Sequence, residues 1–296
     1  MNNFSASPIR KQTLPIVFIH IGNNEYLTYT LAQAKISNPD TKVYLIGDPS
    51  NDHFDFIEHH NLEKYCIESE LFSMIYRHHS TNPPWIELFC FQRWFILKEF
   101  MSQNRIERCL YLDSDIMLFT DINEEQEKLT EYDFSLSHDW SPGFNFINST
   151  NRLRDYCNFV TQCFTSPSLY DSLVETAKQQ AWSQGCLSDM VAFHEYKKRN
   201  PERIGDISLI VDQKKYDSNI NLSEGFEMEG NIKKIYWINN KPFCKHLDSN
   251  ALIMSNSLHL QGGKAKHLAK DYFQGELHFS ENRGKWSLKK PPEDLD

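Results

Sequence analysis

Two carboxylates interrupt an apolar run that extends over residues 109–119. The first part of the run is continuous up to Leu112 and follows charged residues, which is typical of a strand buried on both faces in the parallel sheet of an α/β protein. Ionised carboxylates are too costly to bury without partners. We therefore expect the strand to end at Leu112 and to place Asp113 and Asp115 at its carboxyl edge, where open α/β sheets bind ligands.

The spacing of these carboxylates suits a metal ion. In an extended backbone, positions i and i+2 face the same side, so Asp113 and Asp115 can address one cation. Two acidic oxygen donors favour a hard divalent ion that a diphosphate also holds. A second Asp-x-Asp at 294–296 lies in a Pro-rich charged tail. The pattern is therefore weak without its preceding strand, and a capping or turn role is the alternative interpretation.

Composition limits the class of protein. The chain has 296 residues, of which 40% are hydrophobic, enough for one large α/β domain or two small ones. A net charge of -9 argues against broad nucleic-acid binding. No stretch approaches the roughly 18 apolar residues of a transmembrane helix, and residues 1–14 are too polar for a signal peptide. We expect a cytoplasmic protein without a transmembrane segment, and peripheral membrane association remains open. The scattered cysteines favour neither disulfides nor structural zinc.

Hydrophobic patterns and breaker residues predict alternating strands and helices. A strand, helix and strand over residues 15–46 form a βαβ unit, which places the loop 22–26 at the carboxyl edge of the sheet. This loop has no Gly-x-Gly-x-x-Gly, so dinucleotide binding has no support. The other predicted strands are 65–67, 109–112, 132–137, 144–148, 207–211, 232–238 and 252–260, and the predicted helices are 25–36, 85–101, two pieces within 151–182, and 187–198.

These elements predict an α/β fold with a single Rossmann-like, mostly parallel sheet flanked by helices. We expect one domain over residues 15–288, preceded by an N-terminal segment, 1–14, and followed by a flexible tail, 289–296.

Two charged residues fall inside predicted helices. Arg93 lies in a helix that is apolar nearly all round, and a buried guanidinium needs an anionic partner. It forms either a structural salt bridge or a contact with the ligand or with Asp113. Asp189 stands in the first turn of a later helix, where acidic residues are favoured anyway. A structural and a functional role are both open for each residue.

Several of these features together resemble the metal-dependent GT-A glycosyltransferases, most nearly the glycogenin-like and lipopolysaccharide galactosyltransferase-like retaining enzymes. The features are Asp113-Ser114-Asp115 after a strand, the stretch 143–148, an acidic residue in a later helix, and the late His259-Leu260-Gln261-Gly262. The resemblance covers roughly residues 15–270. It implies a GT-A fold and transfer of a sugar, with retention, from a nucleoside diphosphate sugar, a UDP-sugar being favoured. The expected acceptor is a glycan, a lipid-linked glycan or a protein.

The resemblance also assigns residues to roles. It implies that Asp113, Asp115 and His259 hold Mn²⁺ or Mg²⁺, and an imidazole beside two carboxylates favours Mn²⁺. Asp189 is the candidate at the reacting carbon, although the Asp-Gln-Asp of the family is absent there. The expected donor-binding residues are Ile19, His20, Ile21, Gly22, Asn23, Tyr26, Arg93, Asp113, Ser114, Gln184, Gly262, Lys264 and Lys266. Asn145 or Asn148 is our candidate for orienting the acceptor.

Two details of these assignments stay open. The lysine spacing of the family falls on Ala265, so either Lys264 or Lys266 meets the diphosphate. His259 is alternatively a core histidine at the end of a strand. For the metal-free protein, we expect that Asp115→Ala leaves stability unchanged or slightly raised, because the change removes repulsion between two carboxylates.

Other functions fit parts of the pattern. A haloacid-dehalogenase-like phosphatase also places Asp-x-Asp after a strand, but expects Thr or Val where Met117 stands. A nucleotidyltransferase of similar fold expects a Gly- and Arg-rich loop after the first strand, and this loop has one Gly and no Arg. A sugar-nucleotide-binding module without turnover is the alternative that is not an enzyme.

Overall fold

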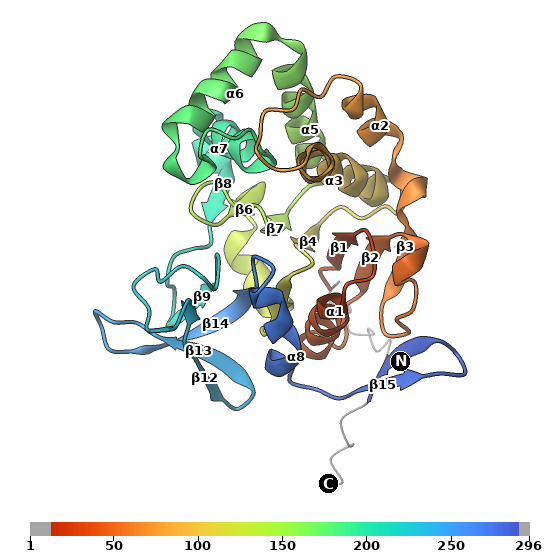
Figure 1. Ribbon diagram of the computed structural model, residues 1–296, viewed down its shortest axis with the longest axis vertical. Helices are drawn as coiled ribbons and strands as arrows, with labels where there is room; N and C mark the ends of the chain where they lie inside the picture. Colours follow the sequence, from red (N-terminus) through yellow and green to blue (C-terminus); the bar gives the residue numbers. More distant parts are fainter. Residues whose placement is uncertain (1–12, 290–296) are drawn as a thin grey trace, which may run out of the picture.

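The computed structural model describes residues 13–289 of the chain. Most of the predicted N-terminal segment, nearly all of the predicted tail and the second Asp-x-Asp lie outside these residues. The described part is a mixed α/β structure in which helices cover both faces of a central sheet (Figure 1). The fold class predicted from the sequence is thus confirmed.

The central sheet has the strand order β3-β2-β1-β4-β7. Its strands are β1 (Ile16–His20), β2 (Val43–Gly47), β3 (Glu58–Asn61), β4 (Cys109–Leu112) and β7 (Phe144–Ile147). The first four are parallel, and β7 runs antiparallel to β4. Strands β1, β2, β4 and β7 are buried throughout, as their apolar sequences predict. Strand β4 ends at Leu112, as expected.

Side chains alternate between the two faces of this sheet. On one face, Ile16 and Phe18 pack with Leu27 and Leu31 of helix α1 (Glu25–Ser37). On the other face, the side chains of β1 and β4 pack against helices α3 (Pro84–Gln103), α5 (Thr150–Thr165) and α7 (Asp189–Arg199). Figure 1 shows α1 below the sheet and the other three helices above it. The sheet therefore has no solvent face at its centre.

A second sheet lies beside the first and has the order β12-β13-β14-β5, with β9 paired to β14. Its strands are β5 (Ile116–Leu118), β9 (Lys214–Tyr216), β12 (Ile235–Ile238), β13 (Lys241–Lys245) and β14 (Leu252–His259). The prediction of a single sheet was incomplete. Strand β5 follows the Asp-x-Asp directly but pairs with β14 from the far end of the chain, a long-range pairing that no local pattern records.

Some predicted strands were misplaced. The predicted strand 65–67 is instead a turn and the start of helix α2 (Ile67–Ser73), and the third strand of the sheet is the polar segment β3. An edge strand that is partly exposed lacks the apolar pattern by which strands are predicted. Residues 207–211 form no strand, and their apolar side chains at 209–211 are exposed.

Other predictions agree within a few residues. Predicted strand 132–137 is β6 (Phe134–Leu136), and 232–238 divides into β11 (Ile232–Lys233) and β12. The two predicted helical pieces are α5 and α6 (Pro167–Gln179), and Ser149 caps α5 through the backbone N–H of Asn151. The remaining helices and strands are α4 (Ile122–Glu125), α8 (Ala269–Tyr272), β8 (Ile204–Asp206), β10 (Met228–Glu229), β15 (Leu277–Ser280) and β16 (Lys285–Leu288).

Within residues 13–289, no helix combines the length and the apolar character that crossing a bilayer requires. All seven cysteines lie in this part of the chain and are free thiols.

Candidate active site

The two aspartates lie at the junction of the two sheets. Strand β4 ends at Leu112, and a tight turn, in which the Ile116 N–H donates to the Asp113 carbonyl at 3.0 Å, leads directly into β5. The backbone is therefore not extended here, contrary to our expectation. The carboxylates of Asp113 and Asp115 nevertheless converge with His259, and one potential ligand atom from each of the three lies within 4.8 Å of the others.

Asp113 is held by a buried guanidinium. Arg93 donates through Nη1 to Asp113 Oδ1 at 2.5 Å and through Nη2 to Asp189 Oδ2 at 2.7 Å. The Tyr111 hydroxyl donates to the same Asp113 oxygen at 2.8 Å. Burial alone would lower the pKa of Arg93, but the two carboxylates outweigh it and raise this pKa. Arg93 thus reaches Asp113 and joins it to Asp189.

Asp189 occupies the first turn of α7 without capping it. Its side chain is buried and accepts from Arg93 and, at 2.9 Å, from the indole N–H of Trp94. The N-cap residue Ser188 makes no side-chain cap. The Asp189 carboxylate is therefore oriented by two hydrogen-bond donors on α3 and does not cap α7.

Asp115 faces two cationic groups instead of one. Its Oδ1 lies 3.4 Å from His259 Nε2, and its Oδ2 lies 3.2 Å from Lys266 Nζ. Burial would raise the pKa of Asp115, but His259 and Lys266 lower it to about 2. Burial would likewise lower the pKa of His259, but Asp115 raises it to about 9. In the metal-free protein these groups form an ion triad.

The orientation of His259 is fixed by β9 and the residues that follow it. Its Nδ1 donates to the Ser218 carbonyl at 2.8 Å, and its backbone N–H donates to Asp217 Oδ2 at 3.0 Å. Nε2 is therefore the nitrogen directed at the carboxylates. A histidine that binds a metal through one ring nitrogen usually donates a hydrogen bond from the other, often to a backbone carbonyl. Asp217 and Ser218 gave no signal in the sequence, because their role depends on the pairing of β9 with β14.

Gly143 closes the site from the side of β7. A Cβ at this position would lie 2.8 Å from Asp113 Oδ2 and 3.4 Å from His259 Cε1. The Gly143 carbonyl also accepts from the Asp113 N–H at 2.7 Å. Only glycine permits this approach, so Gly143 belongs to the site. Its place at the start of the stretch 143–148 was the signal that sequence analysis passed over.

The loop after β1 is anchored to the loop after β2. The Gly22 N–H donates to Asp48 Oδ2 at 2.5 Å, and Gly22 has a φ of 91°, which favours glycine. His20 Nε2 lies 2.9 Å from Asn24 Oδ1. Ile19 is buried in the core, and the exposed residues of the loop include Ile21 and Asn23.

A cavity of about 300 Å³ opens between this loop and the segment after β14. Tyr26 lines it, and its hydroxyl lies 3.4 Å from Ser114 Oγ. Lys266 lines it too, with Nζ 4.9 Å from the centre of the Tyr26 ring. The other lining residues are Asn24, Glu25, Tyr29, Gly263, His267 and Lys270. The cavity thus meets the Asp115 triad at Lys266, whereas Gly262 and Lys264 are exposed and do not line it.

The three remaining predicted residues lie differently. Asn148 is at the opposite end of β7, where its amide is occupied by Arg108 and by the carbonyls of Leu129 and Tyr132, so it does not reach the cluster. Asn145 is buried opposite Tyr111, and its Nδ2 has no partner among the described residues. Gln184 is exposed, with a left-handed backbone (φ 52°), in the loop before α7.

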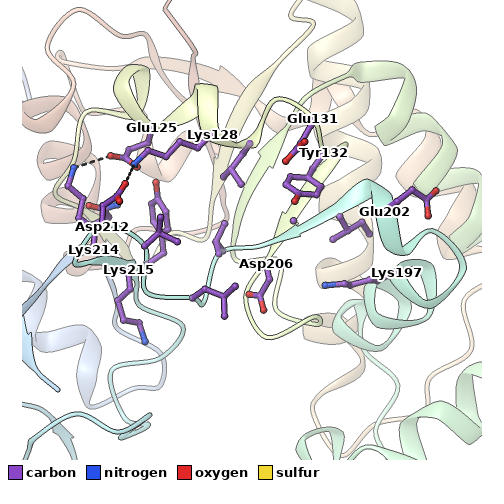
Figure 2. Close-up of a pocket in the computed structure, with 18 of the residues that line it drawn as sticks. Glu125, Lys128, Glu131, Tyr132, Lys197, Glu202, Asp206, Asp212, Lys214 and Lys215 are labelled. Carbon is purple, nitrogen blue, oxygen red and sulfur yellow. Dashed lines mark hydrogen bonds and ion pairs between the residues drawn. The ribbon is translucent and has the colours of Figure 1, made fainter. Parts of the chain in front are cut away.

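A second and larger cavity lies elsewhere in the described structure. It measures about 880 Å³, and neither Asp113, Asp115 nor His259 lines it. Figure 2 shows Glu125 at its edge, paired with Lys128 and Lys214, while Tyr132 and Asp206 lie on the other side. Charges of both signs alternate around this cavity, so it offers no concentrated field for an anionic ligand.

The donor set at the sheet junction fits a divalent ion. Two carboxylates and an imidazole converge, the imidazole presents Nε2, and Gly143 leaves the space between them open. Mixed oxygen and nitrogen donors of this kind suit Mn²⁺ better than Mg²⁺.

No protein-family model matches this sequence, and neither does any curated protein. Solved structures with a similar arrangement do exist. Mouse xyloside xylosyltransferase 1 overlaps with a TM-score of 0.49 and 10% identity, over 69% of this chain and 88% of that one. The glycosyltransferase GlyE of Streptococcus pneumoniae overlaps with a TM-score of 0.33 and 15% identity, over 68% of this chain and 46% of that one. The bifunctional glycosyltransferase WbbM overlaps with a TM-score of 0.44 and 10% identity, over 90% of this chain and 50% of that one. At these identities and scores, the activity has to be argued from the side chains of the chain itself.

Proposed function

We propose that this protein is a metal-dependent glycosyltransferase, which moves a sugar from a nucleoside diphosphate sugar to an acceptor hydroxyl. The observation that carries the proposal is the convergence of Asp113, Asp115 and His259 at the junction of two sheets, next to a cavity that Lys266 enters. Negative charge develops on the diphosphate as it leaves, and nearby cations stabilise it. A metal ion at this cluster and Lys266 would supply that positive charge.

The residues divide the work between them. Asp113, Asp115 and His259 would hold the divalent ion, and that ion, when bound, neutralises charge on the departing diphosphate. Lys266 pairs with Asp115 in the metal-free protein, and we propose that it turns to the diphosphate once the ion takes its place beside Asp115. The cavity beside Tyr26 and Tyr29 would receive the nucleoside, and a UDP-sugar is our first candidate donor.

We further propose transfer with retention at the anomeric carbon. The bond from that carbon to the diphosphate oxygen breaks, and its electron pair leaves with the diphosphate. The acceptor oxygen bonds to the same face, and its proton passes to the departing diphosphate. Asp189, held by Arg93 and Trp94, would stabilise positive charge on the sugar. NMR of the anomeric coupling in the first-formed product tests this, and an inverted linkage would contradict it.

The phosphatase interpretation is disfavoured by the partners of Asp113. That mechanism needs the first aspartate as a free nucleophile. Oδ1 of Asp113 already accepts from both Arg93 and Tyr111. A carboxylate held by two donors is a weakened nucleophile, so hydrolysis of phosphate monoesters is not expected.

The decisive experiment measures binding and turnover together. We expect UDP-, GDP- or TDP-sugars to raise the melting temperature in Mn²⁺ and not in EDTA. Asp115→Asn should abolish this shift, whereas Asp212→Asn, at an exposed aspartate in the other cavity, should keep it. Release of nucleoside diphosphate on adding acceptor identifies a transferase. Binding without release would leave a binding module, and equal donor affinity in EDTA and in Mn²⁺ would overturn the proposal.

A further inference from the structure

A strained hairpin turn borders the site on the side of Asp113. Ser137 and Ser141 exchange two backbone hydrogen bonds of 2.9 Å, and the chain between them turns through two left-handed residues, His138 (φ 54°) and Asp139 (φ 67°). Such backbone is unfavourable outside glycine, and it persists where the surroundings enforce it, often at functional sites.

Side chains from two other segments hold this turn in place. His138 Nε2 pairs with the Glu224 carboxylate, and Asp139 pairs with Lys197 of α7. The turn then runs through Ser141 to Gly143, which contacts Asp113. Its geometry is therefore connected directly to the proposed metal site.

The turn presents Trp140, which stacks on Trp182. The two rings are nearly parallel, with centroids 4.7 Å apart and an interplanar angle of 13°. Both indoles are partly exposed, unlike Trp94, which is fully buried in the core. Trp182 comes from a short 3₁₀ turn, Ala181–Ser183, in the segment that leads to α7 and Asp189. Two partly exposed indoles thus stand together where two active-site loops meet.

This pair lies on the acceptor side of the proposed reaction. The donor cavity adjoins Asp115 through Lys266, whereas the hairpin and the loop before α7 adjoin Asp113 and Asp189. Two residues, Ser141 and Pro142, separate Trp140 from Gly143, so the Cα atoms of Trp140 and Gly143 lie within about 11 Å of each other. A saccharide bound at the indoles would therefore lie on the Asp113 side of the site.

We propose that Trp140 and Trp182 form a subsite for a carbohydrate acceptor. The inference rests on the proposed glycosyltransferase function and narrows its acceptor to a glycan. The C–H face of a pyranose carries partial positive charge and packs on the negative face of an indole. Two exposed polar residues lie close in sequence to the pair: Asp139, which pairs with Lys197, and Gln184. A saccharide matches both an aromatic face and neighbouring polar side chains, whereas a lipid chain has no hydroxyls to bond and a peptide has no flat C–H face.

The test compares Trp182→Ala with Trp237→Ala, at an exposed tryptophan on β12 of the second sheet. Acceptors are a panel of mono- and disaccharides and sugar-free serine and tyrosine peptides. We expect transfer to a saccharide, a rise of about tenfold or more in its KM for Trp182→Ala, and no change for Trp237→Ala. The donor KM and the slow hydrolysis of donor without acceptor should stay within twofold of wild type. Trp182→Phe should recover part of the loss.

A purely structural role would give a different pattern. If the stack only braces the loops, Trp182→Ala lowers the melting temperature and changes donor and acceptor KM together, and the proposal is overturned. Preferred transfer to sugar-free peptides overturns it as well. Calorimetric titration with the same saccharides gives a readout without turnover. Saccharide binding that Trp182→Ala abolishes supports the subsite even if the wild type transfers nothing, in which case only the glycosyltransferase proposal fails.

Discussion

Asp113 and Asp115 are neighbours in sequence and opposites in environment. Asp113 shares one guanidinium with Asp189 and accepts from Tyr111, all on α3, β4 and α7 around the first sheet. Asp115 is paired with His259 and Lys266, which come from β14 and the segment after it. Asp113 thus shares the single cation Arg93 with a second carboxylate, Asp189, whereas Asp115 has two cationic partners to itself.

This difference suggests separate duties for the two halves of the site. In the Asp113 half, Arg93 and Tyr111 hold the carboxylate in place from within the core, and we expect this half to stay rigid when a substrate binds. In the Asp115 half, both partners have proposed roles with ligands, because His259 is a potential metal ligand and Lys266 lines the cavity proposed for the donor. Binding of a metal and a diphosphate is therefore expected to reorganise the Asp115 half and to leave the Asp113 half nearly unchanged.

The largest expected effect is on turnover. Asp115→Asn should lower sugar transfer by about 10³-fold, since it removes a charged ligand of the ion that neutralises the leaving group. Steady-state release of nucleoside diphosphate measures this. Asp206→Asn, in the large separate cavity, is the control and should stay near wild-type activity. Transfer by Asp115→Asn within tenfold of wild type would show that the aspartate is not a metal ligand.

Breaking the locked half should cost stability. Arg93→Met leaves Asp113 and Asp189 without their shared cation, and we expect a loss of about 3–5 kcal/mol in the free energy of unfolding. Urea denaturation measures the loss. Arg283→Met, at an exposed ion pair with Asp55, should cost less than about 1 kcal/mol. Similar losses for both variants would mean that Arg93 is not the structural centre of this half.

The pH dependence of stability should separate the two aspartates. In EDTA, His259 has a pKa of about 9 in the folded protein against 6.5 for an unperturbed group. Its stabilising contribution is therefore complete below pH 6.5 and is lost as the pH rises through 9, by on the order of 3 kcal/mol. Asp115→Asn should remove most of this decline, and Asp113→Asn should keep most of it.

The same ion triad revises an expectation from the sequence. Relief of repulsion between the aspartates predicted that loss of Asp115 would not destabilise the metal-free protein. The pKa of Asp115 is instead lowered to about 2 by its two cations, so its charge stabilises the fold at neutral pH. We now expect Asp115→Ala to lower the melting temperature in EDTA. A melting temperature equal to or above that of wild type would favour the original expectation.

The smallest expected effect concerns the two lysines. Lys266→Met should raise the donor KM by about tenfold, because it removes a cation beside the diphosphate. Lys264→Met should change it less than twofold, because Lys264 is exposed and lies outside the cavity. Equal effects of the two substitutions would mean that the loop changes conformation when the donor binds.

The candidate site was predictable to different degrees on its two sides. The apolar strand before Asp113 and the glycines and lysines after His259 are local patterns, and they identified the three converging residues correctly. Asn148 was misplaced because a strand pattern does not say which end of an antiparallel strand lies at the site. Gly143 and Ser218 were missed because their importance depends on side chains that approach from other elements.

By itself, the sequence determined the class of fold, the end of β4 at Leu112 and the chemical types present at the site, since burial and charge act on short segments. Tertiary structure decided which carboxylate meets which cation. Strand β5 pairs with β14 and thereby joins Asp115 to His259. Helix α3 packs on the central sheet and places Arg93 between Asp113 and Asp189. Such long-range pairings depend on the packing of whole surfaces, and no local pattern of residues encodes them.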